Sequence, residues 1–187
     1  MTILTGDFLT LDDGRPAVRL TRAYRRPVEQ VWSYASDPAA LARWFPSTFE
    51  AAELRPGATI RFFDDPQMPE STGTVLAADA PHHLSYTWGA DEMRLDVTAL
   101  GDGSTRLTLT NVLESADTAA RNAAGWEVCL NALDAADRGE AEASSTPAWK
   151  ELYDAYVAAE FPSGAPVPGS DDATRGGHTP DTSTPDA

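Results

Sequence analysis

The stretch that decides the fold is residues 117–139, DTAARNAAGWEVCLNALDAADRG. Its apolar residues recur at steps of three and four, which places five of them on one stripe of an α-helix: Ala119, Ala123, Trp126, Leu130 and Leu133. The polar residues of the stretch fall mostly on the other faces. We expect Asp117 to cap the start of this helix, and Gly139 fits the left-handed position just past its end. A helix of about 20 residues is about 30 Å long, enough to cross a small domain.

The segment before this helix changes to an apolar period of two. Strands are predicted over residues 49–54, 59–64, 73–78, 83–88, 93–100 and 105–112. Turn residues separate them at intervals of about ten residues, which is typical of an antiparallel meander. Leu84, Tyr86 and Trp88 share one face of their strand, with polar residues opposite. A sheet with one apolar face needs a cover on one side only, and the long helix is the expected cover.

The remaining segments complete the order of elements. Residues 3–25 read as a hairpin, and residues 27–35 and 38–43 as two short helices, the second capped by Asp37 and followed by Trp44 and Phe45. A terminal helix is predicted over residues 147–160. Residues 162–187 consist mainly of Pro, Gly, Ser, Thr and Asp and cannot bury enough apolar area to offset the entropy of ordering. We therefore expect a domain over residues 1–161 and a disordered tail over 162–187.

Composition limits the classes of partner. The 187 residues carry a net charge of −15, and so acidic a surface repels nucleic acid and anionic membranes. No apolar run reaches the roughly 18 residues that span a bilayer, and the N-terminus lacks the pattern of a secretion signal. Cys129 is the only cysteine, which excludes an internal disulfide; we expect it to be buried and the compartment to be the reducing cytoplasm.

Three local patterns carry a family resemblance: RPVEQVW at residues 26–32, DPAALARWFP at 37–46 and GWEVCLNAL at 125–133. With the order of elements, they resemble the SRPBCC (START/Bet v 1-like) superfamily, in the branch similar to the C-terminal domain of the activator of Hsp90 ATPase. The resemblance implies an α+β helix-grip fold, in which a curved antiparallel sheet wraps around a long C-terminal helix with a cavity between them. It also implies binding of lipids, hormones, polyketides or other hydrophobic molecules, and some members are enzymes.

Six large residues are candidates for the cavity lining, because they lie on faces that the sheet and helix should turn toward each other: Phe45, Phe62, Tyr86, Trp88, Trp126 and Leu130. The alternative is that they only fill the core. The Tyr86 hydroxyl and the Trp88 indole N–H should each find a hydrogen-bond partner when buried. Arg22 and Arg94 could pair with a ligand carboxylate, although Arg94 is expected on the wet face of the sheet.

Catalytic, metal and cofactor sites are not predicted. His82 and His83 lie at a turn without a third metal ligand nearby, and the sequence has neither a phosphate-binding glycine loop nor a nucleophile elbow. The first hypothesis is a non-catalytic binder of a small hydrophobic molecule. The second is a cyclase- or dehydratase-like enzyme using the same cavity, with Tyr86, Glu92 or Asp96 for proton transfer, although the strand alternation places Asp96 outside.

A third hypothesis is an interaction module for a chaperone partner, which the sequence itself does not support. A free edge strand of the N-terminal hairpin could also allow a homodimer.

Overall fold

Eight antiparallel strands form one curved sheet in the computed structural model, which describes residues 4–65, 68–140 and 148–167. The order across the sheet is β1-β2-β8-β7-β6-β5-β4-β3. The bounds are β1 (Gly6–Thr10), β2 (Pro16–Tyr24), β3 (Thr48–Glu50), β4 (Thr59–Phe63), β5 (Ser71–Asp79), β6 (His83–Trp88), β7 (Asp91–Ala99) and β8 (Thr105–Val112). β1 and β3 are therefore the two edges.

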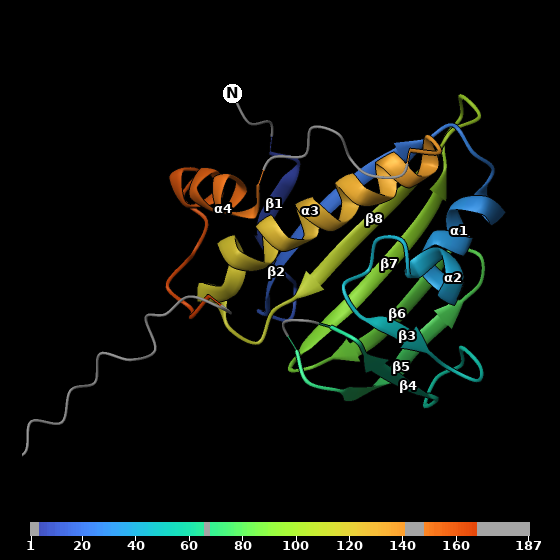
Figure 1. Ribbon diagram of the computed structural model, residues 1–187, viewed down its shortest axis with the longest axis horizontal. Helices are drawn as coiled ribbons and strands as arrows, with labels where there is room; N and C mark the ends of the chain where they lie inside the picture. Colours follow the sequence, from blue (N-terminus) through green and yellow to red (C-terminus); the bar gives the residue numbers. More distant parts are fainter. Residues whose placement is uncertain (1–3, 66–67, 141–147, 168–187) are drawn as a thin grey trace, which may run out of the picture.

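The long helix α3 (Ala119–Asp137) crosses one face of the sheet, as Figure 1 shows. The short helices α1 (Val28–Ser36) and α2 (Pro38–Leu41) lie at one end of the sheet, and α4 (Trp149–Ala158) lies beside α3 at the β1 edge. A 3₁₀ turn, η1 (Ala116–Thr118), leads into α3.

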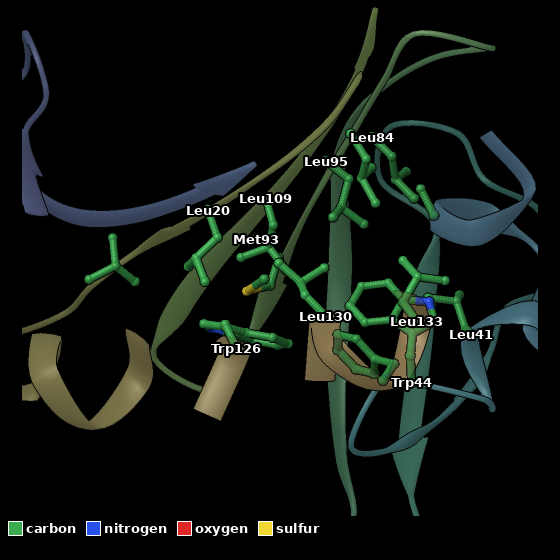
Figure 2. Packing of buried hydrophobic residues seen from close by; sticks show 14 of the residues in the cluster. Leu20, Leu41, Trp44, Leu84, Met93, Leu95, Leu109, Trp126, Leu130 and Leu133 are labelled. Atoms are coloured by element: carbon green, nitrogen blue, oxygen red, sulfur yellow. The ribbon is translucent and has the colours of Figure 1, made fainter. Parts of the chain in front are cut away.

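The core lies between α3 and the inner face of the sheet. Figure 2 shows Trp126, Leu130 and Leu133 of α3 directed toward strand residues such as Leu20, Met93 and Leu109. The register sets this face, because Leu20, Leu109 and Leu95 lie opposite one another across β2, β8 and β7. Burial of one stripe of the helix against one side of the sheet confirms the expected arrangement.

Several predicted boundaries need correction. β6 and β8 match the predicted strands, but the strand predicted over 49–54 is reduced to Thr48–Glu50. Asp117 does not cap α3: it lies inside η1, and the N-cap position is Thr118, without a side-chain cap bond. Asp37 does cap α2, accepting from the N–H groups of Ala39 and Ala40.

Gly139 has the expected left-handed backbone, with φ of 76°. The segment after α4 packs against β1 and the start of α3. The N–H of Ala120 donates to the carbonyl of Pro162 at 3.0 Å, and the ring centroids of Phe161 and Phe8 are 6.2 Å apart. The chain therefore stays in contact with the domain at residues 161 and 162. Residues 168–187 of the predicted tail lie outside the described residues, and the domain boundary stays a prediction.

Candidate ligand-binding site

Phe45 is the centre of an aromatic cluster beneath α3. Its ring centroid lies 5.4 Å from that of Trp88, 5.6 Å from Trp126, 6.2 Å from Phe62 and 6.5 Å from Tyr86. These rings come from the segment after α2 and from β4, β6 and α3. Five of the six candidate residues are therefore brought together, and Leu130 is buried one turn along α3 from Trp126 in the same core.

The rings of this aromatic cluster touch one another directly. Centroid separations of 5.3 to 6.5 Å are normal for aromatic contacts. Five of the candidates are buried, and Trp88 is only half-buried, at the margin. These side chains therefore pack against one another, and a role in lining a ligand site stays a prediction.

One ring of the cluster was missed by the sequence reasoning. Phe49 lies 5.7 Å from both Phe62 and Tyr86. It lies opposite Phe62 in the β3–β4 pair. A cross-strand aromatic pair joined by a turn at Pro56 and Gly57 was the available signal, since directly opposed residues share one face.

The Tyr86 hydroxyl is buried and has no hydrogen-bond partner in the described part of the structure. The expectation that it would find one is wrong. Burial raises the pKa of this phenol above its usual value, so the hydroxyl stays neutral and remains available as a donor. A buried hydroxyl without a partner costs about 1–3 kcal/mol, and such groups are rare.

The Trp126 indole, in contrast, is fully engaged. Its N–H donates to the Asn111 side-chain oxygen at 3.0 Å, and the same oxygen accepts from Asn122 at 2.9 Å. Both amides also donate to Asp91, at 3.0 and 2.9 Å. This polar group fixes the orientation of the Trp126 ring against Trp88, 5.3 Å away. The sequence reasoning did not identify Asn111 or Asp91.

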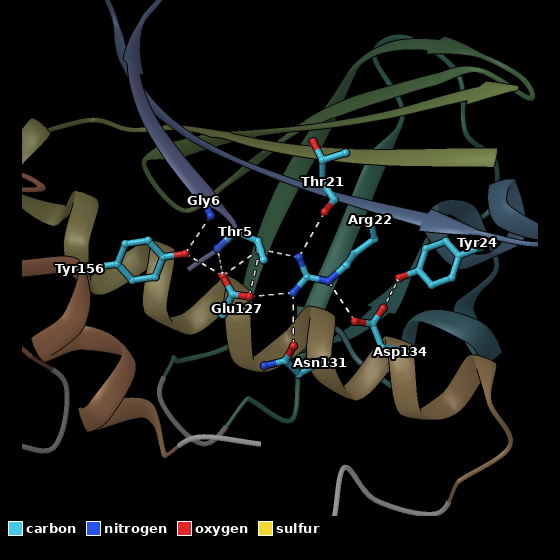
Figure 3. Close-up of polar contacts among 9 residues, drawn as sticks. All are labelled: Thr5, Gly6, Thr21, Arg22, Tyr24, Glu127, Asn131, Asp134 and Tyr156. Carbon is cyan, nitrogen blue, oxygen red and sulfur yellow. Dashed lines mark hydrogen bonds and ion pairs between the residues drawn. The ribbon is translucent and has the colours of Figure 1, made fainter. Parts of the chain in front are cut away.

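Arg22 lies on the inner face but is enclosed by polar partners, as Figure 3 shows. Its guanidinium pairs with Glu127 at 2.8 Å and with Asp134 at 2.9 Å. Burial lowers the pKa of this group, but the two carboxylates outweigh burial and the net pKa is raised. Glu127 also accepts from the Tyr156 hydroxyl at 2.6 Å, which joins α4 to α3.

The other polar candidates lie elsewhere. Arg94 pairs with Glu92 at 2.6 Å, and Asp96 pairs with His83 at 2.7 Å. By register these side chains point away from α3, since Met93, Leu95 and Val97 of the same strand point inward. Two of the three proton-transfer candidates, Glu92 and Asp96, are therefore outside the aromatic cluster.

The remaining features to consider are the single thiol, possible metal ligands and helices that could span a membrane. Cys129 is half-buried, and burial raises the pKa of its thiol to about 12, with a smaller contribution from the charge of Asp65. Within residues 4–65, 68–140 and 148–167, no group of three or more His, Cys, Asp or Glu could hold a metal ion. No helix in these ranges is long and apolar enough to cross a bilayer. The cytoplasmic location stays a prediction.

Comparison with known proteins places the fold. The family model described as "Activator of Hsp90 ATPase homolog 1-like protein" matches residues 25–136, and no curated protein matches the sequence.

Three solved structures show the likeness. The crystal structure of CalU16 from Micromonospora echinospora has a TM-score of 0.61 at 23% identity, over 82% of this chain and 94% of its own. EF2215 from Enterococcus faecalis, a conserved protein of unknown function, has a TM-score of 0.66 at 21% identity, over 83% of this chain and 90% of its own. DynU16, encoded in the dynemicin biosynthetic locus, has a TM-score of 0.55 at 22% identity, over 66% of this chain and 48% of its own. At these identities the likeness shows the fold, and the expected α+β helix-grip (Bet v 1-like) architecture is confirmed.

Proposed function

Since the chain belongs to the Activator of Hsp90 ATPase homolog 1-like family, we propose that it uses the helix-grip fold to bind a small hydrophobic molecule between α3 and the sheet. The proposed site is the aromatic cluster around Phe45. Flat rings on several sides suit a flat apolar ligand, and binding pockets typically combine an apolar wall with a few polar groups.

The observation that carries this proposal is the unpaired Tyr86 hydroxyl. It is the one buried side-chain polar atom of the described residues that lacks a partner, and it lies among the rings of Phe45, Phe49 and Phe62. A ligand that accepts a hydrogen bond would remove its cost of about 1–3 kcal/mol. The site therefore gains more from a ligand with an acceptor than from a plain hydrocarbon.

Entry of a ligand needs a ring to move, because the cluster is packed. Trp88 is the least buried of the five candidate rings. Trp126 is held by Asn111, and Phe45 contacts five other rings. We therefore propose that Trp88 turns outward when the ligand enters, which brings a change in tryptophan fluorescence.

The test is binding of prodan, a neutral fluorescent naphthyl ketone, to the wild type and to Tyr86→Phe. We expect saturable binding to the wild type and at least about fivefold weaker binding to the variant, the loss of about one hydrogen bond. The variant without ligand should unfold at the same or a higher denaturant concentration, because it loses only an unpaired hydroxyl.

This pairing separates the binding role from a structural one. A Tyr86→Phe protein that is clearly less stable without ligand would mean that the hydroxyl has a structural partner, and the observation behind the proposal would be lost. Absence of any prodan binding to the wild type, with no shift in melting temperature, would contradict the proposed function itself.

Two other functions remain hypotheses. A cyclase- or dehydratase-like enzyme would have to rely on Tyr86, because Glu92 and Asp96 point away from the cluster. A chaperone partner is suggested by the family description alone. Co-precipitation with the cell's Hsp90 homologue tests it, and lack of enrichment would end it.

A further inference from the structure

We infer that the ligand is an uncharged aromatic molecule with a carbonyl-type acceptor, and that the site rejects carboxylate analogues of the same shape. This inference rests on the proposed function and adds the chemical class of the ligand. It follows from how the charges around the inner face of the sheet are already used.

The first step concerns the only basic side chain that the described strands turn toward α3, which is Arg22. Every N–H of its guanidinium has an acceptor. Nε donates to Asp134, one terminal nitrogen donates to Glu127 and Asn131, and the other donates to the Thr5 hydroxyl and the Thr21 carbonyl (Figure 3). No donor is left for the carboxylate of a ligand.

The second step is the sign of the local charge. The guanidinium of Arg22 is already paired with two carboxylates, Glu127 and Asp134, on a different side of α3 from Trp126, so it offers the aromatic cluster no free cation. The acid linked to the aromatic cluster is Asp91, which is two hydrogen bonds away from the Trp126 ring through Asn111. A ligand anion in the aromatic cluster would therefore have an acid nearby and no available cation from the described strands. Repulsion of this kind is strengthened by the low dielectric of a protein interior.

The third step is the number of donors that the cluster offers. A buried carboxylate needs several hydrogen bonds or a cation, whereas a ketone or ether oxygen needs one donor. The Tyr86 hydroxyl supplies one neutral donor. The Trp126 N–H is already bonded to Asn111, and the Trp88 indole N–H, the other donor of the cluster, is neutral as well and belongs to a half-buried ring at its margin. The donor count and the charge thus favour the same class of molecule.

The experiment compares a naphthyl methyl ketone with the corresponding naphthoate, which has nearly the same shape but carries a charge. Calorimetry or melting shifts at neutral pH should show the ketone binding at least tenfold more tightly. The difference between the two compounds should persist when salt is raised, because buried charges are screened much less than exposed ones. Tyr86→Phe should weaken ketone binding and leave the low naphthoate affinity as it is.

The outcomes distinguish the two proposals. Naphthoate binding as tight as that of the ketone would overturn the inference about charge and leave the proposed function in place. Ketone binding that is unaffected by Tyr86→Phe would overturn the assignment of the acceptor to this hydroxyl. Failure of both compounds and of prodan to bind would remove the proposed function, and the inference with it.

Discussion

The two sides of α3 that face the rest of the protein are both buried, but they are held by different forces. One side presents Trp126, Leu130 and Leu133 to the inner face of the sheet. The other presents Glu127 and Asp134 to β2 and, through Tyr156, to α4. Glu127 is only 2% exposed, as buried as the tryptophan beside it. A polar stripe on a helix is thus not always the solvent side, and here it is a second docking surface.

The difference between these two sides predicts how each responds to damage. An apolar contact loses free energy in proportion to the area and volume removed, and the neighbours can partly relax. A buried ion pair responds abruptly, because removing one partner leaves the other charge in the interior without compensation. If Glu127 is lost, Arg22 keeps Asp134 as a partner, but the terminal nitrogen that donated to Glu127 belongs to a side chain only 10% exposed and cannot easily reach water.

The largest effect is expected from Glu127→Ala. This change strips a carboxylate from Arg22 and an acceptor from both Thr5 and Tyr156. We expect the free energy of unfolding, measured by urea titration with circular dichroism, to fall by about 3–5 kcal/mol. The double variant Arg22→Ala/Glu127→Ala should lose less than the sum of the two single changes, since the two groups interact.

The matched control is the exposed pair of Glu50 and Arg61, with both side chains 59% exposed. Glu50→Ala should cost about 0–1 kcal/mol, as for surface ion pairs in general. Equal costs for Glu127→Ala and Glu50→Ala would mean that the polar side of α3 opens readily to water, and the contrast between the two sides would disappear.

A slightly smaller effect is expected from Leu130→Ala on the apolar side. Leu130 is 1% exposed, and its truncation should lower the free energy of unfolding by about 2–5 kcal/mol in the same urea titration. Leu76, which is 44% exposed, supplies the control, and Leu76→Ala should stay within about 0.5 kcal/mol of the wild type. A cost below about 1 kcal/mol for Leu130→Ala would contradict tight packing beneath α3 and would favour space that is already available to a ligand.

The same two sides explain what the sequence could predict. The apolar stripe repeats within α3 itself, and the turns around β6 and β8 are marked by Gly, Asp and Pro, so the helix and the antiparallel sheet could be predicted from these patterns. The helix-grip fold was predicted from the family resemblance of residues 26–32, 37–46 and 125–133. The polar side could not, because its partner Arg22 is 105 residues away from Glu127 along the chain and nothing local marks the pair.

In the candidate site, too, the positions of apolar rings could be predicted, but the hydrogen bonds could not. The inward positions of Trp88 and Trp126 followed from strand alternation and helical spacing, whereas Phe45 lies in the segment between α2 and β3, where neither period applies. The unpaired state of the Tyr86 hydroxyl could not be predicted, because it depends on which atoms fail to reach it. The bonds of Asn111 were equally invisible, since Asp91 and Asn122 reach it from β7 and α3.

The smallest effect concerns the point where the polar side reaches the β1 edge. The N–H of Gly6 donates to the Tyr156 hydroxyl at 3.0 Å, and a Cβ at Gly6 would lie only 2.6 Å from that oxygen. Gly6→Ala must therefore displace a hydroxyl that also bonds to Glu127, and we expect the free energy of unfolding to fall by about 1–2 kcal/mol in the urea titration.

Gly101, whose added Cβ would meet nothing within 4 Å, is the control, and Gly101→Ala should leave the free energy of unfolding nearly unchanged. In a Tyr156→Phe background the cost of Gly6→Ala should shrink, because the clashing oxygen is gone. An undiminished cost there would show that Gly6 is required by β1 itself and not by the contact that joins α4 to the sheet.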